Sequence, residues 1–163
     1  MSIVAAAAPL ALHRETVQPE WTDYNGHMNL AYYMLVFDHA TDCLFDHLDL
    51  GRDYVARDNH SLFALEAHVT YEQELNAGDP VRVTTQLLDC DAKRLHYFHR
   101  MYHATEGYLA ATNELISIHV DLATRRSTPL PQAALAWLEA LLAAHRHLPR
   151  PPQAGRVIGI RRR

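Results

Sequence analysis

The feature that most constrains how this chain folds is a change of hydrophobic period near residue 50. Before that point, apolar positions recur every three or four residues, which is the spacing of one face of an α-helix. Gly51 supplies a stop signal for this helix. After it, apolar and polar residues alternate, which is typical of β-strands. The positions on the helical face are Leu30, Tyr33, Met34, Phe37, Thr41, Leu44, Phe45 and Leu48.

Five strands are expected beside this helix. Turn-forming clusters separate the last four, which are therefore expected to pair as antiparallel neighbours. A last helix is predicted from Gln132 to His147. The order strand, long helix, four strands, helix is an α+β architecture, and a curved sheet wrapped around the long helix would bury its apolar face best. The strands span residues 10–19, 61–75, 81–90, 95–104 and 109–122.

The predicted strand at residues 61–75 alternates between two faces, which assigns its side chains to one face or the other. Glu66 and His68 share the polar face. They are either a hydrogen-bonded pair on an exposed surface or part of the lining of a ligand pocket. The apolar face holds Phe63, Leu65, Ala67, Val69 and Tyr71, and the polar face holds Glu66, His68 and Thr70.

Charge and cysteine content narrow the function classes. A formal net charge of −4 argues against nucleic acid as the main partner. The apolar N-terminus lacks the basic region of a secretory signal and is too short to cross a bilayer, so no membrane association is expected. Cys43 and Cys90 form no CxxC motif, which leaves a reducing cytoplasm as the expected compartment.

Chain length predicts one folded domain with two appendages, because 163 residues can bury a core without disulfides. A flexible lead-in is expected at residues 1–9, and the folded domain at 10–147. Residues 148–163 form a basic tail rich in proline and arginine.

The stretch WTDYNGHMN, from Trp21 to Asn29, stands directly before the long helix and is dense in polar chemistry. Asp23 and Asn25 are common residue types at helix starts, so one interpretation is that they only cap the helix. The other is that the loop carries a reactive site. The residues alone leave both open.

This stretch and the order of elements resemble the hotdog-fold acyl-CoA thioesterases of the 4-hydroxybenzoyl-CoA thioesterase type. WTDYNGHMNLAYY is similar to the active-site loop of that family, and HVTYEQELNAGDPVRVTTQLLD to its second and third strands. HVDLATRRSTPLP is similar to its last strand, so the likeness covers about Leu10 to Pro131. The resemblance implies hydrolysis of a small acyl-CoA and no cofactor besides the CoA of the substrate. It also implies a homodimer or a dimer of dimers, with sites between subunits.

By this resemblance Asp23 takes the position of the catalytic carboxylate, acting as general base or as nucleophile. Asn25 and His27 are two residues apart and could flank the same site in an extended loop. A helix start offers unpaired backbone N–H groups that can hold an oxyanion. The candidate donors here are the N–H groups of Gly26, His27 and Met28.

Within the family, LEAHVTYEQEL and ATNELISIHVDLATRR are most similar to thioesterases of bacterial carnitine degradation, which release glycine betaine from betainyl-CoA. The trimethylammonium cation of that substrate is stabilised by aromatic faces and carboxylates. The alternatives are another short-chain or aromatic acyl-CoA as substrate, and a non-catalytic acyl-CoA-binding module. The candidate substrate-binding residues are Trp21, Tyr24, Glu66, His68, Tyr71 and Glu114.

CoA carries phosphates, so basic side chains are expected beside its channel. No metal site is predicted from the twelve histidines, because His96 and His99 point to opposite faces of their strand. A row of aspartates on the long helix is expected to face solvent. The candidates for CoA are Lys93, Arg94, Arg125 and Arg126, and the aspartates are Asp38, Asp42, Asp46 and Asp49.

Overall fold

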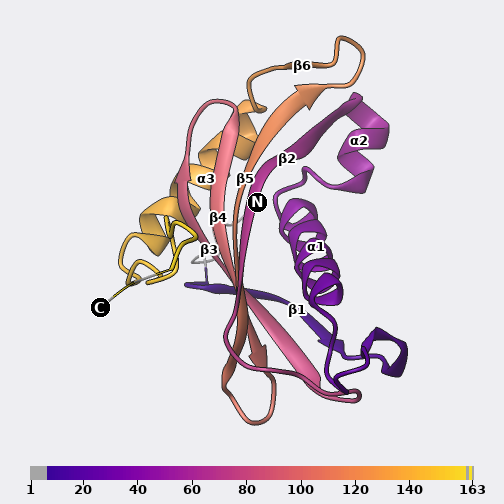
Figure 1. The fold of residues 1–163 in the computed structure, drawn as a ribbon. Helices are drawn as coiled ribbons and strands as arrows, with labels where there is room; N and C mark the ends of the chain where they lie inside the picture. The colour runs from indigo at the N-terminus through magenta and orange to yellow at the C-terminus, as the bar shows by residue number, and fades with distance from the viewer. Residues whose placement is uncertain (1–6, 161, 163) are drawn as a thin grey trace.

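The long helix α1 (Leu30–His47) lies along one antiparallel sheet, as the change of period predicts (Figure 1). The computed structural model describes residues 7–160 and 162 of the chain. In this part of the chain the other elements are β1 (Leu10–Thr16), the 3-10 turn η1 (Pro19–Trp21), α2 (Arg52–Asp58), β2 (His60–Tyr71), β3 (Pro80–Cys90), β4 (Arg94–His103), β5 (Leu109–Asp121), β6 (Arg126–Ser127) and α3 (Gln132–His145).

The strands form one sheet in the order β1-β3-β4-β5-β2, with the short β6 beside β5, and all described pairs are antiparallel. Strands β1 and β2 are therefore the two edge strands of this five-strand order. In the view of Figure 1, strands β3 to β5 stand between α1 on one side and α3 on the other. The predicted α+β architecture is confirmed. Within the described ranges, no helix is both long and apolar enough to cross a membrane.

Helix α1 forms because its apolar side chains meet the sheet along one stripe. Tyr33, Phe37 and Leu44 lie on this stripe at helical spacing, and all three are buried. The side chain of Asn29 caps the helix by accepting a hydrogen bond from the N–H of Ala31 at 3.0 Å. This satisfies one of the N–H groups that a helix start leaves unpaired. The cap fixes where the helix begins and where the preceding loop ends.

Strand β2 departs from strict alternation. Its register against β5 shifts between Ala64 and Glu66, where a β-bulge inserts one residue. Leu62 is consequently buried at 8% exposure, while Phe63 is 36% exposed. Val69, beyond the bulge, packs against the core beneath α1. The predicted face shared by Phe63 and Val69 is therefore wrong, because one inserted residue moves the side chains before it to the other face.

Helix α2 is absent from the sequence prediction. Its seven residues carry no apolar period, and only Tyr54 is buried. Gly51 is its N-cap residue, so the glycine that was expected to end α1 also opens the next helix. A helix of this length is stabilised by packing and not by its own sequence.

His99 of β4 is completely buried behind α1. Burial, together with the charge of His13, lowers its pKa to about 3. The hydroxyl of Thr41 donates to the carbonyl of Phe37, so its oxygen accepts from the Nε2–H of His99 at 3.0 Å. The hydroxyl of Thr85 then donates to Nδ1 at 2.8 Å. Both nitrogens of the neutral imidazole are thus hydrogen-bonded, and burial disfavours the charged ring.

We predict that His99 makes the protein less stable as the pH falls from 7 to 5. An imidazole in the unfolded chain titrates at about 6.5, whereas the folded protein keeps His99 neutral down to about 3. Protons therefore bind to the unfolded state, and the free energy of unfolding should fall by about 2 kcal/mol from this group alone. Urea unfolding at pH 7 and pH 5 measures the loss. His99→Gln should lose about 2 kcal/mol less, and an equal loss in both proteins would contradict the assignment.

Candidate active site

The stretch Trp21–Asn29 folds into a closed loop before α1. Two backbone hydrogen bonds close it: the N–H of Asp23 donates to the carbonyl of His27 at 3.0 Å, and the N–H of Asn29 donates to the carbonyl of Trp21 at 2.8 Å. Gly26 turns the chain with a φ of +80°, which side chains with a Cβ rarely adopt. The loop therefore has one defined shape, set by its own backbone.

The carboxylate of Asp23 is held by two donors. Oδ1 accepts from the N–H of Asn25 at 2.8 Å, and Oδ2 accepts from the side-chain amide of Asn29 at 3.5 Å. The N-cap of α1 is Asn29, and not Asp23 or Asn25. Asn29 thus links the start of the helix to the carboxylate, and Asp23 is not used as a cap.

A cavity of about 370 Å³ opens beside this carboxylate. Two tyrosines form an aromatic wall, with the rings of Tyr33 and Tyr71 edge to face and their centroids 5.3 Å apart. The hydroxyl of Tyr71 donates to the carbonyl of Leu30 at 3.2 Å, which ties the end of β2 to the first residue of α1. Burial raises the pKa of Tyr33 to about 12, so its phenol is neutral at neutral pH. The lining residues are Asp23, Asn25, His27, Met28, Leu30, Tyr33, Tyr71, Glu72, Gln73 and Glu74.

The three predicted oxyanion donors differ in availability. The N–H groups of Gly26 and Met28 already donate to backbone carbonyls, at 2.9 and 2.8 Å. The N–H of His27 has no acceptor within the described chain, and neither has the N–H of Leu30 at the first helical position. Both of these residues line the cavity. Among the residues of the loop and the helix start that line the cavity, the N–H groups without an acceptor in the described chain are therefore those of His27 and Leu30.

Of the other side chains predicted from this loop, His27 lines the cavity, whereas Trp21 and Tyr24 lie outside it. The Nε2 atom of His27 is 3.6 Å from a carboxylate oxygen of Glu74 at the rim of the cavity. Trp21 stacks on Tyr32, with ring centroids 5.4 Å apart, and is not among the lining residues. Tyr24 is 98% exposed.

Glu66, His68 and Glu114 come together, but away from Asp23. They line a second cavity of about 370 Å³. Glu114 accepts hydrogen bonds from the Nε2 of His96 at 2.7 Å and from the N–H of Gly155 at 2.7 Å. In a single copy of the chain, these three candidates therefore form a separate polar cluster beneath the C-terminal tail.

The four basic candidates gather at the other end of the sheet. Tyr71, at the Asp23 cavity, pairs with Ala111 of β5, whereas Arg94 pairs with Ile118, seven residues further along. Seven residues of a strand span about 23 Å. In one copy of the chain this separates the basic cluster from the Asp23 loop. Its members are Lys93, Arg94, Arg125 and Arg126.

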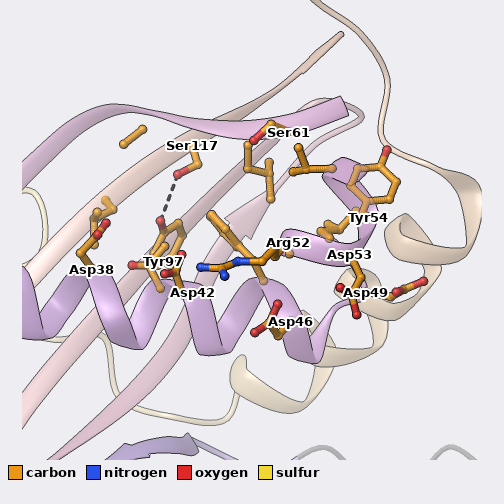
Figure 2. A pocket seen from close by; sticks show the side chains of 18 of the residues that line it. Asp38, Asp42, Asp46, Asp49, Arg52, Asp53, Tyr54, Ser61, Tyr97 and Ser117 are labelled. Atoms are coloured by element: carbon orange, nitrogen blue, oxygen red, sulfur yellow. Dashed lines mark hydrogen bonds between the residues drawn. The ribbon is translucent and has the colours of Figure 1, made fainter. Parts of the chain in front are cut away.

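A larger cavity of about 860 Å³ lies between α1, α2 and the sheet, and Figure 2 shows it from close by. Asp38, Asp42 and Asp46 line one side, and all three are exposed, as expected for a solvent-facing row. Burial and the charges of Asp38 and Asp46 raise the pKa of Asp42. Figure 2 also shows the hydrogen bond between Tyr97 of β4 and Ser117 of the neighbouring strand β5, whose atoms are 3.0 Å apart. This cavity, called the acidic hollow below, thus has aspartates along one side and apolar side chains of the sheet, such as Leu62 and Leu115, on its floor.

The acidic hollow adjoins the Asp23 cavity along α1, because Met34 of the one lies a helical turn after Leu30 of the other. Asn113 in its wall is 0% exposed, and its Oδ1 has no partner within the described chain. The hollow does not contain Asp23. The cavity beside Asp23 combines a carboxylate residue with residues whose N–H groups are unpaired within the described chain, a set that can activate water and hold an oxyanion, so it is the better candidate for the reaction.

Glu72, Gln73 and Glu74 are the cavity residues that the sequence did not single out. Residues 72–75 were assigned to a strand, but β2 ends at Tyr71. The N–H groups of Glu72 and Gln73 both donate to the carbonyl of Ala110, which turns the chain back toward α1. The available signal was the loss of alternation in the run YEQEL.

Known proteins resemble the chain over nearly its whole length. It is 45% identical over 151 residues to the betainyl-CoA thioesterase of Pseudomonas aeruginosa, covering 93% of this chain and 95% of that protein. It is 35% identical over 157 residues to the L-carnitine dehydrogenase/betainyl-CoA thioesterase of Rhizobium meliloti, covering 96% of this chain. The chain spans about a third of that longer relative, at 32% of its length.

Solved structures also match the chain over nearly its whole length. A Staphylococcus aureus protein, whose structure was solved in complex with CoA, superimposes with a TM-score of 0.87 at 31% identity. The match covers 96% of this chain and 99% of that one. The sequence profile of the thioesterase-like superfamily matches residues 17–138. The resemblance to hotdog thioesterases is confirmed, and the chain belongs to the thioesterase-like superfamily.

Proposed function

We propose that this thioesterase hydrolyses betainyl-CoA to glycine betaine and CoA, and that Asp23 carries the reaction. The observation that supports the substrate most strongly is the 45% identity to the Pseudomonas aeruginosa enzyme across nearly all of both chains. The position of Asp23 supports the mechanism, because Asp23 lines the same cavity as His27 and Leu30, whose N–H groups have no acceptor within the described chain.

The reaction needs water to add to the thioester carbon and the carbon–sulfur bond to break. A carbonyl placed against the N–H groups of His27 and Leu30 would be polarised, and the oxyanion would be stabilised at the positive end of α1. Asp23 then acts either as a general base on water or as the nucleophile. In the first route it returns the proton to the departing CoA thiolate, so no cofactor is required.

The trimethylammonium group is proposed to lie against Tyr71, with Tyr33 behind it. A cation over an aromatic face gains about 0.5–2 kcal/mol per ring. Glu72 and Glu74 at the rim add negative charge to the same cavity. This assigns substrate recognition to Tyr71, and adds two carboxylates that the sequence did not single out.

A dimer built through the edge strand β2 is part of the same proposal. Leu65 and Tyr71 of this strand are 58% and 50% exposed, and one edge of β2 has no neighbouring strand within the described chain. An apolar, unpaired edge favours addition of a second strand. Since Tyr71 also lines the cavity, a second copy would contribute to the site.

A cytoplasmic location is also proposed, because Cys43 and Cys90 are both free thiols.

The first prediction concerns the catalytic carboxylate. Asp23→Asn keeps the size of the side chain but can neither accept a proton nor attack, so kcat for betainyl-CoA should fall by roughly 10²–10⁴-fold. Release of CoA thiol, followed with a thiol reagent, measures it. Glu20→Gln, at an exposed acid three residues upstream, is the matched control and should keep its activity. Full turnover in Asp23→Asn would reject the proposed mechanism, but the assignment of betainyl-CoA as the substrate would stand.

The second prediction concerns the cation. The neutral analogue 3,3-dimethylbutanoyl-CoA has a carbon in place of the ammonium nitrogen and the same shape. The ratio of kcat/KM for betainyl-CoA over this analogue should fall about 3- to 10-fold in Tyr71→Leu. The difference in intrinsic reactivity between the two thioesters cancels when wild type and variant are compared.

Tyr102→Leu is the control for this comparison, since Tyr102 of β4 is not among the lining residues of the Asp23 cavity. An unchanged ratio in Tyr71→Leu would show that Tyr71 does not bind the trimethylammonium group. If the wild type turned over another short-chain or aromatic acyl-CoA faster than betainyl-CoA, that acyl-CoA would be assigned as the substrate instead. Binding of every acyl-CoA without turnover would identify a non-catalytic module.

A further inference from the structure

Three side chains with metal-binding atoms converge between β1 and α1, outside the cavities described above. The Nε2 of His13 is 3.0 Å from Oε2 of Glu15, and the Nδ1 of His39 is 2.9 Å from the same oxygen. All three ligand atoms lie within 4.8 Å of one another. Within the described chain this is the one such group of three or more.

The fold holds these side chains on two rigid elements. His13 and Glu15 are two residues apart on β1, so they project from the same face of the strand. His39 comes from the middle of α1. The side chains of His13 and Glu15 are 14% and 21% exposed, while that of His39 is 39% exposed. The group is therefore partly enclosed, with one side open to solvent.

The separations are close to those of a tetrahedral metal site. Zinc binds histidine nitrogen and carboxylate oxygen at about 2.0–2.2 Å, which places neighbouring ligand atoms about 3.3–3.5 Å apart. The two observed nitrogen–oxygen separations, 3.0 and 2.9 Å, need to open by only a few tenths of an ångström. Three protein ligands would leave the fourth position to water on the open side.

The surroundings also fit a cation. The second ring nitrogen of His13, Nδ1, lies 3.6 Å from the Sγ of Cys43, a weak partner that leaves Nε2 for a metal ion. Asp42 is close enough to His39 to interact with its charge. Two imidazoles and a carboxylate suit Zn²⁺ and similar transition metals better than Mg²⁺ or Ca²⁺.

We propose that His13, Glu15 and His39 bind a divalent transition-metal ion of the Zn²⁺ class, and that this ion fastens the edge strand β1 to α1. The sequence did not predict this site, because its ligands are spread over 27 positions and two kinds of element. Within its sheet, β1 pairs only with β3. A metal bridge from β1 to the central helix would therefore strengthen the attachment that the Glu15–His39 contact already makes.

The test uses full-length, tag-free protein that has been treated with EDTA and dialysed. ZnCl₂ at about a hundredfold excess over its dissociation constant should raise the Tm by roughly 5 to 10 °C. Co²⁺, added as a spectroscopic probe, should give visible absorption bands typical of four-coordinate cobalt. Glu15→Gln and His39→Gln should each weaken Zn²⁺ binding, measured by calorimetry, by roughly a hundredfold or more.

His47→Gln is the matched control, because His47 lies on the same helix outside the group. It should keep the wild-type metal affinity and the rise in Tm. The rise in Tm is compared with each protein's own metal-free value, so a variant of lower stability remains informative. No rise in the wild type, or an equal rise in Glu15→Gln and His39→Gln, would overturn the proposal.

Discussion

Leu75 holds the two halves of the proposed site together. Its N–H donates to the hydroxyl of Tyr33 at 3.1 Å, and its carbonyl accepts from the N–H of Met28 at 2.8 Å. Its side chain is 0% exposed. One buried residue after β2 thus bonds both to the loop before α1 and to the first turns of the helix. The hydroxyl oxygen of Tyr33 accepts the bond from Leu75 in the buried space between α1 and the end of β2.

This contact explains why a hotdog domain can place chemistry at the start of its helix. The sheet buries α1 along its length, and residues 72–75 turn from the end of β2 toward the loop. The loop contributes Asp23 and a free N–H, and the strand end contributes Tyr71 and two carboxylates. The groups of the proposed site therefore come from segments about 50 positions apart in the sequence.

The sequence predicted what depends on local pattern. Helix α1 follows from its apolar stripe, whereas the role proposed for Asp23 rests on the resemblance of its loop to that of the thioesterases, because the residues alone left a helix cap open as well. Alternation could not reveal the bulge after Ala64, so the faces of β2 were misassigned on one side of it. Glu114 was expected beside the substrate, but it lies with His96 beneath the tail. Which strand face meets which cavity is decided by tertiary packing, and no short pattern encodes it.

The central claim is that the thioester is cleaved beside Asp23, at the start of α1. The most direct measurement is a crystal structure with a betainyl-CoA analogue in which a methylene group replaces the thioester sulfur. The account predicts that the carbonyl oxygen lies about 3 Å from the N–H groups of His27 and Leu30, with the carbonyl carbon facing the carboxylate of Asp23. A carbonyl bound instead in the acidic hollow beside Asp42, or next to Glu114, would contradict it.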